Sequence, residues 1–256
     1  SRGHLIHSWW RMATEAHTAS PWPEGGPFEA GVLRLSKDKG AFEMALHAAR
    51  SVLQPNAPLW VYGANDEGIK SAGKVMQRVL SDVQTVDTRK HCRVMVGTTP
   101  AGVEGLKGTI DEWSQQAELH HREGSITHTV FPGIFAKGSL DAATELLLNT
   151  MDAPQPGHRI LDYACGAGVI GGWMARKEPS VSITQIDADA IAAVAAQRNL
   201  PNARTLIGAS INVLEPDETF DIIASNPPIH IGKSRDYGVL RNLIVASKSR
   251  LRPRGT

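Results

Sequence analysis

A short run near the end of the chain, Asn226-Pro227-Pro228, combines residue types that can hold an amino group for reaction. It follows an apolar stretch that predicts a strand, and α/β proteins place active sites at the carboxyl ends of such strands. The two prolines fix φ and stiffen the turn, so the Asn226 side-chain oxygen and the Pro227 carbonyl can both face a pocket. Each oxygen can accept a hydrogen bond from an exocyclic NH2 group and so point its nitrogen lone pair at an electrophile. Catalysis would then rest on positioning and electrostatics without a strong base; a plain loop is the alternative.

A second candidate site is a glycine-rich loop that lies between an apolar strand and a helix. Gly166 and Gly168 let the backbone pass close to a ligand, and with Gly171 they also match the fingerprint of dinucleotide-binding loops. Asp187, at the end of the next strand, suits a ribose-binding acid in either interpretation. Asp162 favours S-adenosylmethionine, because an acid there accepts hydrogen bonds from its cationic methionine end but would repel a pyrophosphate. The Asn-Pro-Pro run favours the same cofactor.

Both sites require a sheet whose parallel strands end side by side. In the second half, hydrophobic periodicity and breaker residues predict strands at 159–163, 181–187, 203–208 and 220–225, with helices at 140–151, 169–175, 188–199 and 237–251. In the first half, they predict strands at 59–63, 83–88 and 92–97, helices at 41–53 and 67–80, and a connection over 98–125 with a short helix at 110–119. Strand, helix and strand in this order indicate a parallel sheet with crossover helices in each half.

The two halves resemble each other, since 37–66 runs parallel to 135–168, each with a helix, a proline break and a strand that carries Tyr. This indicates duplication, although any two strand–helix units look alike. We therefore expect an α/β fold with two tandem Rossmann-like domains, at 32–125 and 126–256, after an N-terminal arm or linker at 1–31. The length of 256 residues also favours two domains.

Composition sets further limits. The net charge of +1 gives no global basic field, so affinity for nucleic acid must come from local patches. Cys92 and Cys165 fall in different predicted domains, which argues against a disulfide and favours a reducing, intracellular compartment. The stretch 1–22, with two arginines and one acid, fits a remnant after an organellar (mitochondrial) transit peptide, a docking arm or a mobile terminus. His120 and His121 lack ligand partners at metal spacing, so we expect no metal.

The stretches 131–148, 161–169 and 221–233 resemble the small-subunit ribosomal RNA guanine-N2 methyltransferases of the RsmC type. That family has two methyltransferase-like halves, of which the first is degenerate and the second binds the cofactor. The resemblance implies a transferase that uses S-adenosylmethionine to methylate an exocyclic guanine amino group in small-subunit ribosomal RNA, with the RNA, the small subunit or its assembly intermediate as partner. No cofactor is expected in the first half, where Gly63 has no second glycine two residues later.

The resemblance also implies roles for individual residues. The methionine part of the cofactor would be held by Asp162, Ala164, Gly166 and Gly168, and its ribose by Asp187. Ser210 or Asn212 would contact its adenine. The target amino group would be held by Asn226, Pro227 and Pro228, with Ile229 beside the base.

Three features depart from the family pattern. Ala164 replaces the usual first glycine of the loop, and Ile229 stands where many members have an aromatic residue that stacks on the base. We expect the second domain to be incomplete after its fourth strand, whose edge would be exposed unless further strands or a protein partner cover it. The departures favour the alternative of a catalytically inactive factor that binds RNA or protein in ribosome assembly. An enzyme acting on a protein glutamine or a DNA adenine is a third possibility, against which the duplicated first half argues.

The stretch 231–256 is the best candidate for contacting RNA phosphates, with seven Lys or Arg residues and one acid. Lys233 and Arg235, next to the Asn-Pro-Pro run, are the nearest of them, and His230 is a further candidate for RNA contact or for capping the loop. A solvated helix face followed by a tail is the other interpretation.

Overall fold

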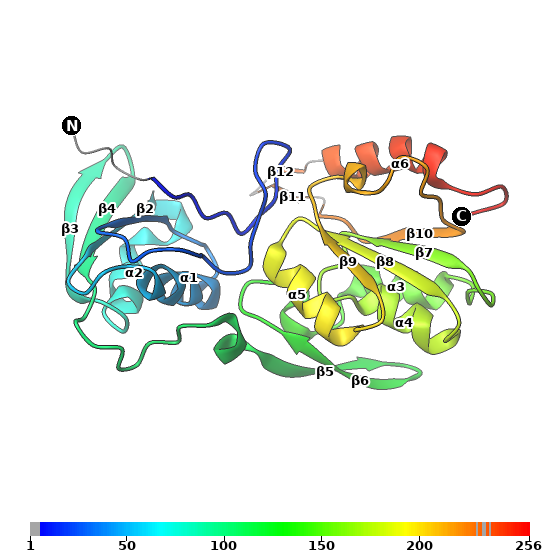
Figure 1. Cartoon of the computed structure of the whole chain (residues 1–256), viewed down its shortest axis with the longest axis horizontal. Helices are drawn as coiled ribbons and strands as arrows, with labels where there is room; N and C mark the ends of the chain where they lie inside the picture. Colours follow the sequence, from blue (N-terminus) through cyan, green and yellow to red (C-terminus); the bar gives the residue numbers. More distant parts are fainter. Residues whose placement is uncertain (1–5, 229, 232–233, 236) are drawn as a thin grey trace. The chain divides into compact units, whose positions relative to one another are not determined.

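The computed structural model describes residues 6–228, 230–231, 234–235 and 237–256 (Figure 1). The chain divides into two compact units, Trp22–Ser114 and a unit that joins Ser1–Pro21 to Gln115–Thr256. The boundaries differ from those expected at residues 31 and 125. The arm joins the second unit because its backbone hydrogen-bonds there, from Ala13 N to Ala188 O (2.7 Å) and from Ala190 N to Arg11 O (2.9 Å).

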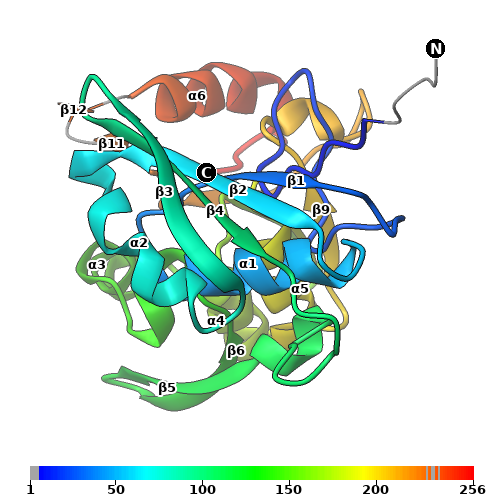
Figure 2. The ribbon, with the colours of Figure 1, turned by 90° about the vertical axis from the view of Figure 1, so that its left-hand side faces the viewer.

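The unit Trp22–Ser114 is a four-stranded sheet with two helices, α1 and α2, on one face (Figure 2). Its strands, in the order β1-β2-β4-β3, are β1 (Gly31–Arg34), β2 (Pro58–Ala64), β4 (Cys92–Thr98) and β3 (Ser81–Arg89). Its helices are α1 (Lys39–Ser51) and α2 (Ile69–Met76), with 3-10 turns η1 (Asn65–Glu67) and η2 (Ile110–Trp113).

The prediction of a parallel sheet in this first unit is wrong. Only β1 and β2 are parallel, and β4 runs antiparallel to both β2 and β3. Lys90 and His91 both have left-handed φ angles, of 42° and 65°, and form a tight turn that folds β3 and β4 into a hairpin. The sequence contains no glycine or asparagine at this turn, so the usual hairpin signal was missing.

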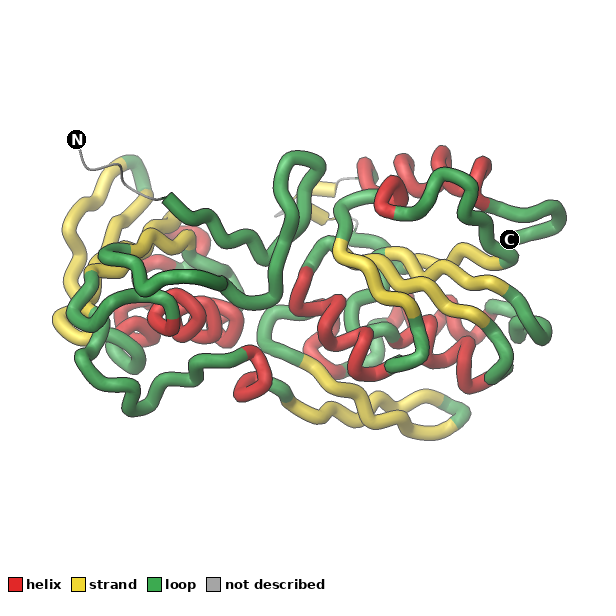
Figure 3. Tube along the Cα trace, viewed as in Figure 1, coloured by secondary structure: helices red, strands yellow, loops and turns green. Residues whose placement is uncertain are grey.

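The second unit contains the predicted parallel sheet, in the order β10-β7-β8-β9. Its strands are β7 (Arg159–Tyr163), β8 (Ser182–Asp187), β9 (Arg204–Ile207) and β10 (Ile222–Ser225), and its helices are α3 (Ala142–Thr150), α4 (Val169–Lys177), α5 (Ala190–Asn199) and α6 (Gly238–Arg250). Short elements are η3 (Phe135–Gly138), η4 (Ile211–Val213), β11 (His230–Ile231) and β12 (Ser234–Arg235). Alternate strand residues face opposite layers: Ile160 packs with α3 and α4, and Leu161 packs with α6. Helices lie on both faces of this sheet (Figure 3).

A hairpin of β5 (Gln115–His121) and β6 (Gly124–Val130) replaces the predicted helix at 110–119. Only the 3-10 turn η2 forms there. The hairpin packs on α5, where the Asn199 amide accepts from Thr129 N (2.6 Å) and donates to Thr129 O (2.9 Å). Leu119 and His128 are buried on the hairpin.

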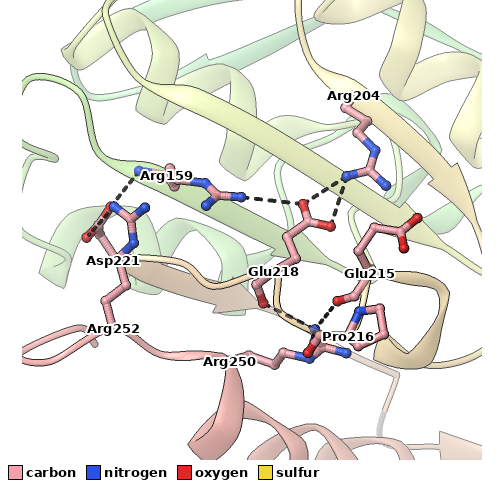
Figure 4. A network of polar contacts seen from close by, with 8 residues as sticks. All are labelled: Arg159, Arg204, Glu215, Pro216, Glu218, Asp221, Arg250 and Arg252. Atoms are coloured by element: carbon pink, nitrogen blue, oxygen red, sulfur yellow. Dashed lines mark hydrogen bonds and ion pairs between the residues drawn. The ribbon is translucent and has the colours of Figure 1, made fainter.

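The edge of β10, expected to be exposed, is paired with the end of the chain itself. Phe220 N donates to Arg250 O (2.8 Å), and Ile223 N donates to Thr256 O (2.8 Å). Charged side chains hold this segment in place (Figure 4): Arg252 pairs with Asp221 at 3.1 Å, and Arg250 donates to backbone carbonyls including that of Glu218. Residues 250–256 thus occupy an edge that we expected further strands or a protein partner to cover.

Candidate active site

The glycine loop between β7 and α4 needs residues without bulk at left-handed backbone positions. Ala164, Gly166 and Gly168 have φ angles of 54°, 55° and 79°. A Cβ atom on Gly168 would lie 2.6 Å from Gln185 Nε2, so this position requires glycine for space as well as for φ. A Cβ atom on Gly166 would meet nothing within 4 Å, so the loop is open to a ligand there. Ala164 adopts the conformation that explains why glycine is usual at its position.

Asp162 lies beneath this loop and is fully buried on β7. Its Oδ2 atom accepts from the backbone N of Gly171 in the first turn of α4 (2.8 Å), and its Oδ1 atom has no partner among the described residues. Burial raises the pKa of the Asp162 carboxyl to about 7, and the negative charge of Asp187 adds to this rise. A cationic ligand above the loop would favour the ionised form.

Asp187 connects the end of β8 to the same loop. Its Oδ2 atom accepts from Gly166 N (2.8 Å) and its Oδ1 atom from Asp189 N (2.8 Å). Burial raises the pKa of Asp187, and the hydrogen bonds from Asp189 and Gly166 oppose that rise. Each carboxylate oxygen has a second lone pair, so both can still accept from a ligand hydroxyl.

The Asn226 side chain is held in one orientation by the start of α3. Its Nδ2 group donates to Asp141 Oδ2 (3.0 Å) and to Thr144 Oγ1 (2.9 Å). Asp141 is the N-cap of α3 and also accepts from the backbone of Ala143 and Thr144. Because both amide hydrogens are used in this way, Oδ1 is the atom of the Asn226 amide that can accept from a substrate.

These groups border one cleft. It is lined by Asn226, Asp141 and Thr144 and by Ala164 to Ala167 of the loop. Asp162 and Asp187 lie behind the loop and support it. Phe135, 61% exposed on η3, also borders the cleft. A cleft that joins an open glycine loop, buried acids and an amide oxygen fits a cationic cofactor beside a target amino group.

The remaining predicted site residues lie at differing distances from this cleft. Ser210 accepts from Asn212 N (3.4 Å) at the start of η4, after β9, and neither residue lines the cleft. Pro227 is buried and Pro228 is exposed. Ile229 and Lys233 lie outside the described residues, whereas His230 and Arg235 are described only as backbone partners of the β11–β12 pair.

The contributions of Asp141 and Thr144 were not apparent from the sequence. Asp141 is the N-cap of α3, a local role that by itself does not indicate a contact with the site. Its contact with Asn226 joins residues that are 85 positions apart, and no local pattern indicates such a pair.

Comparison with known proteins places the chain in a family. The sequence profile of the Methyltransferase small domain matches residues 125–256, and that of the Methyltransferase small domain N-terminal matches residues 6–116. The chain is 31% identical over 245 residues to Ribosomal RNA small subunit methyltransferase C of Pseudoalteromonas atlantica, with 95% of this chain and 71% of the relative covered. The protein of that name from Ectopseudomonas mendocina is 32% identical over 252 residues, which cover 96% and 73%.

The chain belongs to the ribosomal RNA small subunit methyltransferase C family. A solved structure of a family member, the T. thermophilus 16S rRNA N2 G1207 methyltransferase (RsmC) in complex with AdoMet and guanosine, has the same fold, with a TM-score of 0.80 and 23% identity. The match covers 92% of this chain and 65% of that one, so the chain spans less than two thirds of its length. The relatives named here are bacterial and do not support the mitochondrial location suggested by the N-terminal stretch.

Two further properties concern only the part of the chain that the structure describes. No helix there is both long and apolar enough to cross a membrane. No three His, Cys, Asp or Glu side chains among the described residues are grouped so that they could hold a metal ion.

Proposed function

We propose that this protein methylates the exocyclic N2 amino group of a guanine in small-subunit ribosomal RNA, with S-adenosylmethionine as the methyl donor. The observation that carries the proposal is the orientation of the Asn226 amide, whose NH2 group is bound by Asp141 and Thr144 while its oxygen remains for a substrate amino group. The names of the family members support the same activity and RNA.

The residues around the glycine loop fit the cofactor. Asp162, Ala164, Gly166 and Gly168 would hold its methionine part, Asp187 its ribose, and Ser210 or Asn212 its adenine. When bound, S-adenosylmethionine supplies an electrophilic methyl group. Asp162 Oδ1 is buried and has no hydrogen-bond partner among the described residues, and the charge of Asp187 lies nearby; both favour a cationic ligand over one that carries phosphates.

The residues of the turn after β10 would hold the target. Asn226 Oδ1 and the Pro227 carbonyl each accept one hydrogen of the NH2 group, which turns the nitrogen lone pair away from the base ring and toward the cleft. Pro228 keeps the turn stiff. The methylated nitrogen would lose its proton to water, with S-adenosylhomocysteine as the other product, so the side chains need only position the amino group. A guanine in a helix must be unpaired or flipped out to reach this turn.

Ile229, next to the turn, would contact the target base, and His230, Lys233 and Arg235 would contact RNA beside it. Of the other basic residues near the end of the chain, Arg250 and Arg252 already bind backbone carbonyls and Asp221 within the protein. Arg250 and Arg252 are therefore expected to contribute little to RNA affinity, and phosphate binding is expected from the other basic residues of this stretch.

The unit Trp22–Ser114 is proposed to be a degenerate copy that binds no cofactor of its own. A Cβ atom on Gly63, at the end of β2, would lie 2.9 Å from Leu35 Cβ. The Leu35 side chain therefore packs directly on the backbone where a cofactor would have to approach.

The test uses purified protein, methyl-labelled S-adenosylmethionine and unmodified small-subunit ribosomal RNA, followed by mass spectrometry of the digested nucleosides. The wild type should produce N2-methylguanosine and Asn226→Ala should produce it far more slowly, while both bind S-adenosylhomocysteine in calorimetric titration. Cofactor binding without RNA methylation would instead favour a binding factor for ribosome assembly, and a label on adenine would point to another substrate class.

A further inference from the structure

The N-terminal arm is folded by its own contacts. Trp10 and His17 stack with ring centroids 4.5 Å apart and an interplanar angle of 3°. Ser20 N donates to Trp10 O (2.9 Å), and Trp9 Nε1 donates to Ser20 O (3.0 Å). These contacts close residues 9–20 into a loop with a defined shape, which differs from the mobile terminus that was one interpretation of the sequence.

This loop pairs with the segment that follows β8. Ala13 N donates to Ala188 O and Ala190 N donates to Arg11 O, so the arm brackets Asp189 with backbone hydrogen bonds. The Arg11 guanidinium binds both oxygens of Asp189, at 2.8 and 2.6 Å, with side chains that are 20% and 12% exposed. A paired, bidentate contact in this geometry is among the stronger polar interactions in proteins.

Asp189 connects the arm to the cofactor loop. Its backbone N donates to Asp187 Oδ1, and Asp187 Oδ2 in turn accepts from Gly166 N. Asp189 also caps α5 by accepting from Ile191 N (3.0 Å). Since the negative charge of Asp189 raises the pKa of Asp187, the positive charge of Arg11 offsets a repulsion beside the ribose-binding acid.

Arg11 also contacts the segment that leads to the cleft. Its third contact is a hydrogen bond to the carbonyl of Pro132 (3.3 Å), in the segment between β6 and the cleft-lining residue Phe135. One guanidinium therefore joins the segment after β8 to the segment before η3.

We propose that the N-terminal arm is part of the cofactor site and that Arg11 is a positioning residue, which holds Asp187 through Asp189 and fixes the Pro132 segment. This inference rests on the proposed function, because it assigns the cofactor to the loop that Asp187 supports. It extends the site to a segment that lies more than a hundred residues before the glycine loop in the sequence.

The test is calorimetric titration of the full chain with S-adenosylhomocysteine. Arg11→Ala should weaken binding about tenfold, the effect expected for losing hydrogen bonds to a charged group. Arg11→Lys should weaken binding by less than Arg11→Ala, because lysine keeps the charge but cannot bind both carboxylate oxygens in a fork. Asp189→Asn keeps the helix cap and should show a similar loss. Arg34→Ala, which removes the 2.6 Å ion pair with Glu67 in the other unit, is the matched control and should bind normally.

A double-mutant cycle separates positioning from general destabilisation. In a protein that already carries Asp187→Asn, adding Arg11→Ala should cause little further loss of affinity for S-adenosylhomocysteine. Arg11→Ala should nevertheless lower the melting temperature by the same amount as it does in the wild type. Wild-type affinity in Arg11→Ala, or equal losses with and without Asp187, would overturn the inference. Absence of binding by the wild type would overturn the proposed function instead. If Arg11→Ala does not fold, Arg11→Lys and Asp189→Asn provide the same comparison.

Discussion

The two units each contain a strand, a connection and a helix that begins after a left-handed glycine, and they differ in what surrounds it. Gly168 precedes α4 with φ 79°, and Gly68 precedes α2 with φ 100°. In the second unit, β8 runs parallel to β7, so Asp187 ends beside the loop that follows β7. In the first unit, β4 runs antiparallel to β2, and Cys92 starts a strand at the corresponding end.

This difference shows that a strand–loop–helix segment is not by itself a binding site. Parallel neighbours bring their carboxyl ends to one edge, where side chains from separate strands can meet a common ligand. An antiparallel neighbour contributes the start of a strand instead. In the first unit the space over the end of β2 is filled by Leu35.

The largest expected effect concerns the Asn226 turn, for which the first unit has no counterpart. Asn226→Ala removes the oxygen that orients the target amino group and should lower kcat by about 10²-fold or more, as loss of one electrostatic contact in a transition state does. The affinity for S-adenosylhomocysteine should stay within a few-fold of wild type. The measurement is the steady-state rate of RNA methylation at saturating substrate, and an unchanged kcat would show that Asn226 does not orient the target amino group.

The second prediction exchanges the two matched glycines for alanine. Gly68→Ala meets no atom closer than Ser71 Oγ at 4.0 Å, so it should cost about 1 kcal/mol from backbone strain alone. Gly168→Ala adds clashes with Gln185 Nε2 and with Ala196 Cα at 3.2 Å, so its total should reach about 2–4 kcal/mol. Urea unfolding of both variants gives the free energies. Equal costs would show that φ alone, and not crowding around the cofactor loop, requires glycine.

The third prediction compares two buried threonines. Thr144→Val removes a hydroxyl that orients Asn226 and should lower kcat about tenfold, the effect of losing one hydrogen bond, and Thr144→Ser should restore it. Thr99→Val removes a hydroxyl that bonds Gln54 O (2.7 Å) in the first unit. It should lower the free energy of unfolding and leave kcat unchanged. Equal kcat values for the two valine variants would contradict a positioning role for Thr144.

The last prediction is an opposite pH dependence in the two units, with a slope of at most about 1.4 kcal/mol per pH unit for one group. The pKa of Asp162 is raised to about 7 in the folded protein, from an ordinary 3.8, so the folded state binds more protons and loses stability as pH rises through this range. Burial lowers the pKa of His47 from 6.5 to about 4, so the folded state loses stability as pH falls from 6.5 toward 4.

Unfolding of variants at pH 5 and pH 8 measures this contrast. Asp162→Asn should gain stability relative to wild type as pH rises, and His47→Gln should gain relative to wild type as pH falls. The same sign for both differences would show that one of the two groups is not titrating as described.

The sequence by itself determined the parallel strands and the helices of the second unit, though not its β5–β6 hairpin, and it marked the two segments that we propose as the site. Alternating and periodic apolar residues specified the four strands and four helices, and glycines and prolines marked where the chain turns at their ends. The Asn226 turn and the glycine loop were placed correctly at the carboxyl ends of β10 and β7, because strand period and turn residues are local properties.

Only the tertiary structure decided how these parts meet. The direction of β4, the docking of the arm through Arg11 and the pairing of residues 250–256 with β10 all depend on contacts between distant segments. The same is true of the Asn226 amide, whose orientation is set by α3. Hydrogen bonds of this kind form wherever packing brings a donor within about 3 Å of an acceptor, and that distance is a property of the folded core and not of any local stretch of residues.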